Sequence, residues 1–385
     1  MRFKYGTRTV FLLQCSRRIL PGFPRVNIPT MRLSLFVPGL LLPGEVHSDT
    51  VGNLTAPSLA LIAGRGQRCA LAADWLATAF GIAAALPAAA LRKLGAGEAA
   101  QAAEPRKVEA AQAAEPQKVE AAHGEWLCLD PVHWQVTREG ITLDDPARLA
   151  LDATEAAALI AAIQPIFAEW GELSASAPAH WELRLQRPLA LDTRPLPAAI
   201  RQPVSPALPG GTDGRTWRRL LAEAQTVLHA HPVNREREAT DRPTVNSLWP
   251  WGQGSLPGRS PTRFTAAWSS DPVVAGLCAH AGIPCLPPPA SFRPADGNLL
   301  ACIGTLAQPA HALDALAWRE ALLACERDWF APALAAVQRG TVAELCLIGA
   351  RLGMPAATVV WTLRRGDLLR FWRRSRPLAS LAESA

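Results

Sequence analysis

The residues best suited to chemistry lie in one stretch, Val245–Pro257, which reads Val-Asn-Ser-Leu-Trp-Pro-Trp-Gly-Gln-Gly-Ser-Leu-Pro. Its two tryptophans stand beside glycines that have no side chain, as where a strand brings its backbone to the rim of a pocket. The two amides of the stretch could hydrogen-bond a ligand from either side of the tryptophans, although buried amides more often hold backbone. The stretch therefore predicts a ligand pocket, lined by Asn246, Trp249, Trp251, Gly252, Gln253 and Gly254.

The glycines of this stretch could also present backbone N–H groups to an anion. The segment 252–254 lacks the third glycine and the following helix of a dinucleotide fingerprint, and the chain contains no Walker sequence. His229 and His231 come shortly before, at the predicted end of a helix. Two positions apart on a helix, their side chains point about 200° apart, so both can face one ligand only if the helix ends between them. Helix capping and a place in the pocket are both open to them.

A metal-dependent phosphotransferase of α/β type needs Asp and His ligands at strand ends and a Ser or Thr nucleophile. The first predicted strand, Leu33–Phe36, is followed by Val37-Pro38-Gly39, which has no carboxylate. The sequence therefore predicts no metal cofactor. The alternative is a divalent ion such as Mn²⁺ or Zn²⁺, held by the next polar side chains along the chain, Glu45, His47 and Asp49.

The net charge of +6 invites a nucleic-acid interpretation, but it belongs to the first thirty residues. That segment contains six basic side chains and no acidic one, and the remaining chain balances its 33 Asp and Glu with as many Lys and Arg. The arginines of 364–376 alternate with aromatic residues, a pattern that suits nucleic acid. A neutral body favours a solvated, partly paired edge, which argues against nucleic acid as a partner.

The cysteines and the apolar runs of the chain indicate in which cellular compartment it is expected. The eight cysteines form no Cys-x-x-Cys pair and mostly lie in apolar runs, which predicts buried thiols in the reducing cytoplasm. No apolar run reaches the roughly 18 residues that a membrane span requires, so no membrane partner is expected.

Two segments are expected to lie outside the fold. Residues 1–30 carry only the short apolar run Val10–Leu13, below the roughly 7–15 residues of a signal-peptide core, and are interpreted as a basic extension before a start at Met31. Residues 97–122 contain AAQAAEPRKVE followed by AAQAAEPQKVE, which predicts a duplicated, disordered linker. The folded domain is then 31–96 followed by 123–385.

Strand and helix patterns alternate along that domain. Strands are expected at 33–36, 126–136, 141–143, 180–185, 299–303, 342–348 and 359–363, with 368–372 as a strand or a turn. Helices are expected at 58–94 with a break at 64–66, and at 152–169, 216–229, 272–281 and 312–326, with a loop at 187–214 and a polar turn at 234–242. This alternation predicts an α/β fold with a mainly parallel sheet flanked by helices.

Four segments carry a family resemblance. Met31–Pro43, Leu129–His133, Ala222–Pro232 and Val245–Pro257 look like the RpfE-type regulatory protein family. The core Asn-Ser-Leu-Trp-Pro-Trp-Gly-Gln-Gly is similar to the Asn-x-(Ile/Leu)-Trp-x-Trp-Gly-x-Gly segment of archaeal-type, cofactor-independent phosphoglycerate mutases of the alkaline-phosphatase superfamily.

The resemblance implies an alkaline-phosphatase-like core, but with a degenerate catalytic half. Active mutases of that type carry Asp-Gly after the first strand, where this chain has Val37-Pro38-Gly39. Loss of carboxylates from a two-metal site should abolish phosphoryl transfer. We therefore expect a non-catalytic or weakly active, cytoplasmic regulatory protein that binds a small phosphorylated ligand or a regulatory partner. The alternative is a metal-dependent phosphoglycerate mutase or related phosphotransferase.

Overall fold

The computed structural model describes residues 31–71, 74–83, 85–102, 124–138, 140–259, 261–352, 358–370 and 372–384. The expected basic extension 1–30 and most of the expected linker, 103–122, lie outside these residues. The first part of that linker range belongs to a helix that runs to Ala102.

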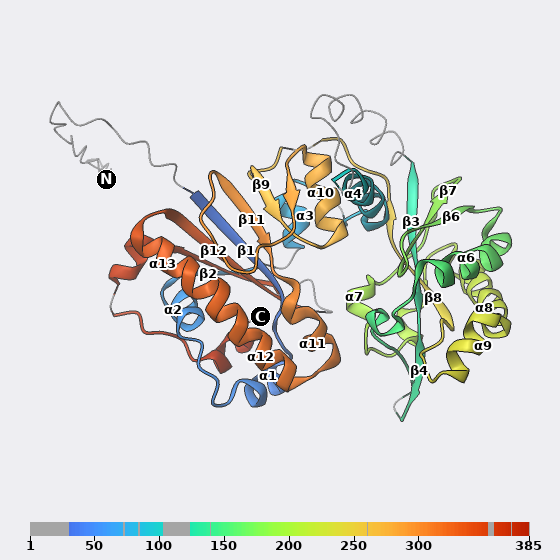
Figure 1. The fold of residues 1–385 in the computed structure, drawn as a ribbon, viewed down its shortest axis with the longest axis horizontal. Coiled ribbons are helices and arrows are strands. Elements are labelled where there is room, and N and C mark those ends of the chain that lie inside the picture. Colours follow the sequence, from blue (N-terminus) through green and yellow to red (C-terminus); the bar gives the residue numbers. More distant parts are fainter. Residues whose placement is uncertain are drawn as a thin grey trace, which may run out of the picture.

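A seven-stranded sheet forms one half of the molecule, in the order β10-β9-β11-β1-β12-β13-β2 (Figure 1). Its first five strands are parallel, and β13 and β2 are antiparallel to their neighbours. The predicted mixed α/β fold with a mostly parallel sheet is confirmed. The strands are β1 (Met31–Leu41), β2 (Gln67–Leu71), β9 (Ala266–Trp268), β10 (Cys285–Leu286), β11 (Asn298–Cys302), β12 (Val342–Arg351) and β13 (Thr358–Arg364).

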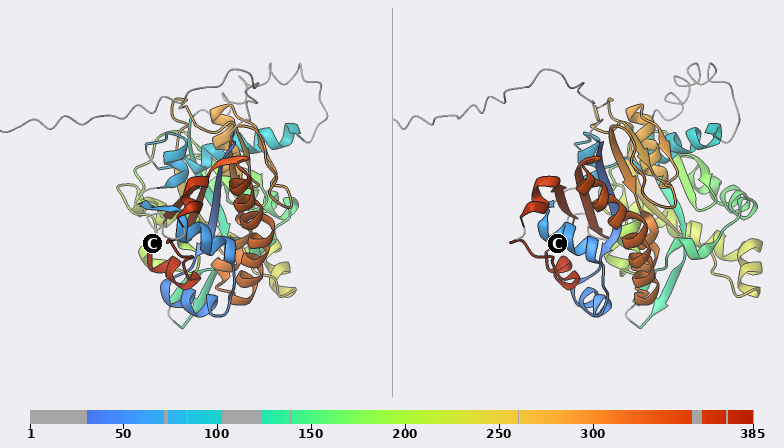
Figure 2. Two further views of the ribbon diagram at one scale, coloured as in Figure 1. Left: turned by 90° about the vertical axis from the view of Figure 1, so that its left-hand side faces the viewer. Right: turned by 60° about the vertical axis from the view of Figure 1, so that its left-hand side comes forward.

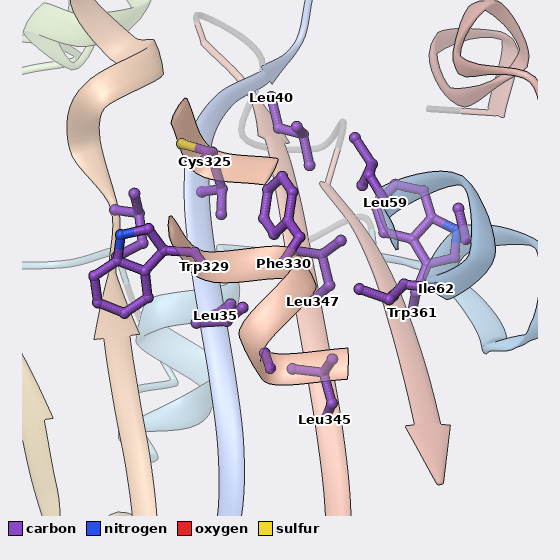
Figure 3. Close-up of a cluster of buried hydrophobic side chains, with 14 of the residues drawn as sticks. Leu35, Leu40, Leu59, Ile62, Cys325, Trp329, Phe330, Leu345, Leu347 and Trp361 are labelled. Carbon is purple, nitrogen blue, oxygen red and sulfur yellow. The ribbon is translucent and has the colours of Figure 1, made fainter. Parts of the chain in front are cut away.

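Helices cover both faces of this mostly parallel sheet. Successive side chains of a strand point to opposite faces, and here the side chains on both faces are apolar. Leu35, Leu345 and Leu347 point to one face, where they meet Phe330 and Trp361 in the core shown in Figure 3. That face carries α1 (Gly44–Val51), α2 (Pro57–Arg65), α12 (Ala315–Cys325), a π-helical turn (Glu326–Phe330) and α13 (Ala331–Arg339), with α11 (Ala307–Ala312) beside β1. The other face carries α3 (Trp75–Ala79) and α10 (Pro272–Ala281). Figure 2 shows β1, in dark blue, between these helical layers.

A separate four-stranded antiparallel sheet, in the order β6-β7-β3-β8, forms the other half. Its strands are β3 (Glu125–Val132), β6 (Gly171–Ala177), β7 (His180–Leu185) and β8 (Ser247–Gly254), and a small hairpin of β4 (Trp134–Thr137) and β5 (Gly140–Leu143) follows β3. One face packs on α6 (Ala153–Phe167) and α8 (Gly214–Ala230) around Phe167 and Trp217. The chain continues from α8 into α9 (Pro232–Ala239), and the short α7 (Leu196–Ala199) lies near β8.

Helix α4 (Ala88–Ala102) joins the two halves, since it contacts both α10 and the second sheet (Figure 1). On the α10 side the helices are so close that a Cβ on Gly276 would lie 2.0 Å from the Leu91 carbonyl oxygen. A Cβ on Gly95 would likewise lie 2.6 Å from the Pro272 carbonyl oxygen. Glycine at these two positions therefore sets the distance between the helices.

Three local expectations are wrong. The range 58–94 is not helical throughout, because Gln67–Leu71 pairs with β13 as an edge strand, and this tertiary pairing overrides its helical composition. Most of the polar turn expected at 234–242 is instead helix α9, because Pro232 is tolerated in the first turn of a helix. The first strand does not stop at Pro38-Gly39 but continues to Leu41 through an irregularity in its register with β12.

Candidate functional site

The Trp-Gly stretch forms β8, an edge strand of the antiparallel sheet that pairs with β3. Gly252 and Gly254 belong to the last part of this strand, with positive φ of +62° and +145°. These glycines face the start of α4. A Cβ on Gly252 would lie 2.8 Å from the Ala88 Cβ, and one on Gly254 would lie 3.1 Å from the Pro87 Cβ. Their absent side chains therefore admit a helix to the strand.

Trp251 anchors a buried ionic cluster beneath that helix. Its indole Nε1 donates to Oδ2 of Asp130 at 2.7 Å. The same carboxylate accepts two bonds from the Arg92 guanidinium of α4, at 2.7 and 3.0 Å. Arg92 also reaches Oε1 of Glu182 on β7 at 2.9 Å. One arginine from α4 thus binds two carboxylates from neighbouring strands, and we name Arg92, Asp130, Glu182 and Trp251 the Arg92 cluster.

Burial perturbs the titration of this cluster. Burial raises the pKa of Glu182 to about 7, against the opposing effects of Arg92 and the Ser176 hydrogen bonds. Burial by itself lowers the pKa of Arg92. The attraction of Asp130 and the other neighbouring acidic groups is larger in total, so the pKa is raised. The pKa of His180, which opens β7, is lowered by burial and by the Arg92 charge. Perturbed groups gathered in one place are typical of functional sites and of structural ion networks alike.

The hydrogen bonds decide between these two roles for the Arg92 cluster. Asp130 Oδ1 also accepts from the Trp181 backbone N–H at 3.1 Å. Glu182 accepts from both the hydroxyl and the backbone N–H of Ser176, at 2.8 and 3.1 Å. Each carboxylate oxygen therefore has a protein donor. Such a cluster fixes α4 on the sheet, and it leaves no carboxylate oxygen for a nucleophilic or metal-binding role.

Two other members of the stretch hold the loop that precedes α8. Trp249, 2% exposed, donates from Nε1 to the Arg194 carbonyl at 2.9 Å, and Gln253 Nε2 donates to the Leu189 carbonyl at 2.7 Å. This loop lines an open cavity of about 520 Å³. Its walls are Asp192, Thr193, Arg194, Pro195, Ala198, Pro206, Ala207, Leu208 and Gly210. The tryptophan and the glutamine support this cavity from behind and do not line it.

The remaining pocket candidates have local roles. The Asn246 side chain accepts from the Trp134 N–H at 2.7 Å and donates to the Trp134 carbonyl at 2.9 Å, so it ties β8 to the hairpin. His229 lies exposed in the last turn of α8. His231 is the N-cap of α9, where Nδ1 accepts from the Val233 N–H at 3.3 Å. The helix does end between the histidines, and the second one caps the next helix.

The alternative metal ligands lie on α1. His47 is buried, its Nε2 is 2.9 Å from the Leu378 carbonyl, and burial lowers its pKa. Asp49 is exposed, and the side chain of Glu45 lies outside the described residues. Within the described ranges, His, Cys, Asp and Glu side chains form no group of three that could hold a metal ion. The donors present there do not fit a two-metal centre.

The carboxyl ends of the parallel strands are where open α/β sheets bind ligands. After β9, Asp271 caps α10 by accepting from the N–H groups of Val273 and Val274. At the end of β11, burial raises the pKa of the Cys302 thiol, which remains protonated and unreactive. Asp271 and Cys302 therefore serve the fold at this edge.

Sequence reasoning missed Arg92 and Glu182 and quoted Asp130 only within a family motif. A signal was present: Asp130 is a carboxylate inside the apolar strand Trp126–Val132, and Glu182 has an apolar residue on each side. A charge in such a position is either exposed on the polar face or buried with a partner. The partner lies on a helix 38 residues earlier in the chain than Asp130, so strand periodicity could not identify it.

Comparison with known proteins gives short sequence matches. No family model matches the chain. It is 36% identical over 81 residues to the 2,3-bisphosphoglycerate-independent phosphoglycerate mutase of Methanosarcina barkeri. It is 41% identical over 59 residues to the enzyme of the same name from Methanosarcina mazei. These matches span 20% and 14% of the length of the two relatives, so the similarity is to a segment of a mutase.

Two solved structures align over most of the chain at low similarity. The alignment with the cofactor-independent phosphoglycerate mutase of Thermoplasma acidophilum spans 93% of this chain and 95% of that one, with 17% identity and a TM-score of 0.42. The alignment with a protein of Pyrococcus horikoshii spans 91% of this chain and 92% of that one, with 12% identity and a TM-score of 0.45. Among the described helices, none has the length and apolarity that a membrane span needs.

Proposed function

We propose that this chain is a phosphoglycerate-mutase-like regulatory protein of the RpfE type, with a degenerate alkaline-phosphatase-like core. It acts in the cytoplasm by binding a small phosphorylated ligand or a regulatory partner, and its turnover is absent or weak. One observation carries the proposal. The Trp-Gly stretch, which resembles a mutase segment, commits its indole, amide and glycine positions to contacts within the protein.

The donor chemistry supports the same proposal. In-line phosphoryl transfer requires acidic and histidine side chains that converge on metal ions and a nucleophile. The two carboxylates of the Arg92 cluster, Asp130 and Glu182, are fully buried and bound to Arg92. A ligand-binding role requires only a shaped cavity with a few polar groups, which the loop before α8 provides.

The test of catalysis is turnover by the full chain. Phosphoglycerate mutase and phosphomonoesterase rates are measured with added Mn²⁺ or Zn²⁺, with and without chelator, and the purified protein is analysed for bound metal. We expect no turnover above the protein-free rate and no stoichiometric metal. Turnover that chelator abolishes, together with a stoichiometric divalent ion, would establish the phosphotransferase alternative suggested by the names of the relatives.

The test of ligand binding addresses the cavity beside Arg194. Its volume of about 520 Å³ lies within the usual range for small-molecule sites, roughly 300–1,000 Å³. Isothermal titration with 3-phosphoglycerate should detect binding that Arg194→Ala weakens at least tenfold, because the guanidinium is the cavity's one cationic side chain among the described lining residues. Arg235→Ala, an exposed arginine on α9, is the matched control. Equal binding by both variants would place the ligand elsewhere.

A further inference from the structure

Two buried carboxylates share one guanidinium in the Arg92 cluster. Asp130 and Glu182 are both 0% exposed, and Arg92 is 3% exposed. Asp130 takes two of the guanidinium bonds, so this bidentate pair is neutral by itself. Glu182 contacts only Nη2 of the guanidinium, which already donates to Asp130. An ionised Glu182 is therefore an additional buried negative charge, and such a charge is costly.

The other groups around Glu182 only partly offset this charge. From α4, Lys93 directs its ammonium to the Ser174 hydroxyl at 3.1 Å, and its attraction for Glu182 is the weakest of the effects on the carboxyl. From β3, the buried Cys128 has a raised pKa and stays neutral. From β7, His180 has a lowered pKa and is also neutral near pH 7. From β6, Ser176 supplies two hydrogen bonds without charge.

We propose that the folded protein holds a proton on Glu182 near neutral pH, and that this proton secures α4 on the antiparallel sheet. A protonated carboxyl donates its O–H to the Ser176 hydroxyl, which turns to accept it, and so keeps its place beside Arg92 and leaves the cluster neutral. Loss of the proton adds a negative charge between α4 and β7 and weakens the docking of the helix. The raised pKa of Glu182, about 7 against an ordinary 4.5, agrees with this reasoning.

The consequence of this proton reaches both halves of the protein. Helix α4 packs on α10 and on the second sheet, so weaker docking of α4 loosens the connection between the halves. The same helix lies against Gly252, on the strand that supports the cavity loop through Trp249. Alkaline pH should therefore loosen this joint, whether or not the protein has catalytic activity.

The first experiment compares urea unfolding of the wild type and Glu182→Gln at about pH 5.5 and about pH 8. Glutamine is neutral at both values and stands in for the protonated side chain. A folded pKa raised above the unfolded one stabilises the protein at low pH, and this stabilisation is lost as pH rises from about 4.5 to about 7. From these two values, the unfolding constant of the wild type should rise about 30-fold relative to the variant between the two conditions.

A ratio that does not change with pH would overturn the proposal, since Glu182 would then be an ordinary ionised member of an ion pair. A change of opposite sign would do the same. Because the variant could fail to fold, hydrogen exchange of the wild type provides a second measurement. After correction for intrinsic exchange rates, amides of α4 should lose protection as pH rises, while those of α6 serve as the internal reference. Equal behaviour of the two helices would also reject the proposal.

Discussion

Gly252→Ala should separate α4 from β8, because the added methyl group has no space. Gly252 has φ of +62°, and a Cβ there would lie 2.8 Å from the Ala88 Cβ and 3.4 Å from the Cys128 Sγ. Carbon atoms prefer separations of about 3.5–4.0 Å, so the first turn of α4 must move by roughly 1 Å. Ala88 is 2% exposed and packed against neighbouring alanines, so it cannot turn away from the contact.

Two effects add in the free energy of unfolding. A non-glycine residue in the left-handed region costs about 1–2 kcal/mol. Overpacking of a methyl group in a closed interior costs about 1–3 kcal/mol. We therefore expect Gly252→Ala to destabilise the protein by about 2–5 kcal/mol. Gly282→Ala is the matched control, since φ there is +71° and nothing lies within 4 Å of the added Cβ, so only the first effect of about 1–2 kcal/mol applies.

Equilibrium urea unfolding followed by circular dichroism measures both variants, with the midpoint compared at constant slope. The double variant Gly252→Ala/Ala88→Gly removes the opposing methyl group and should recover the packing part but not the conformational part. If Gly252→Ala costs no more than Gly282→Ala, or if Ala88→Gly recovers nothing, the glycine does not serve to admit α4 and our reasoning about the stretch is refuted.

Three further predictions concern single contacts. Trp251→Phe keeps a six-membered aromatic ring but removes the indole N–H and its bond to Asp130, and should destabilise by about 1–3 kcal/mol in urea unfolding; an unchanged midpoint would show that this bond contributes nothing. Asp152→Ala removes the capping box of α6 and should cost about 1 kcal/mol, read from thermal unfolding, where equal melting temperatures would contradict it. Burial lowers the pKa of His47, so the neutral imidazole is favoured in the folded protein. The contribution of His47 to stability is present above pH 6.5 and is lost as pH falls below that value through the folded pKa. His47→Gln, which can still donate to Leu378, should therefore reduce the loss of stability in acid, and an unchanged pH profile would count against it.

Local signals in the sequence were sufficient to predict helices that begin with a capping side chain. The helices expected at 152–169 and 272–281 begin after Asp152 and Asp271, and each of these carboxylates accepts from backbone N–H in the first turn as an N-cap. The strands expected at 126–136 and 180–185 cover most of β3 and all of β7, but their assembly into a second, antiparallel sheet was not predicted, because its pairing is not local. Strand β6 reads Gly-Glu-Leu-Ser-Ala-Ser-Ala, a composition without strand preference, and it is held there by pairing with β7.

The predicted site shows a different limit. Residue types in the Trp-Gly stretch indicated a place where backbone and large rings lie close together. They could not show that the neighbour is a helix of the same chain, since a glycine admits Ala88 as readily as it admits a ligand. The importance of Arg92 could not be predicted either, because an arginine in a helix is normally solvated and only the tertiary fold places it between two carboxylates.

The tight packing of α4 on both sides has an evolutionary consequence. The helix meets Gly252 on one side and Gly276 on the other, so neither neighbour can accept a larger residue while the helix keeps its position. Substitutions should therefore be coupled: a related protein with a larger residue at position 252 should carry glycine at position 88, or a displaced helix. Position 276 faces the Leu91 backbone, which no substitution can shorten, and should vary least of the three.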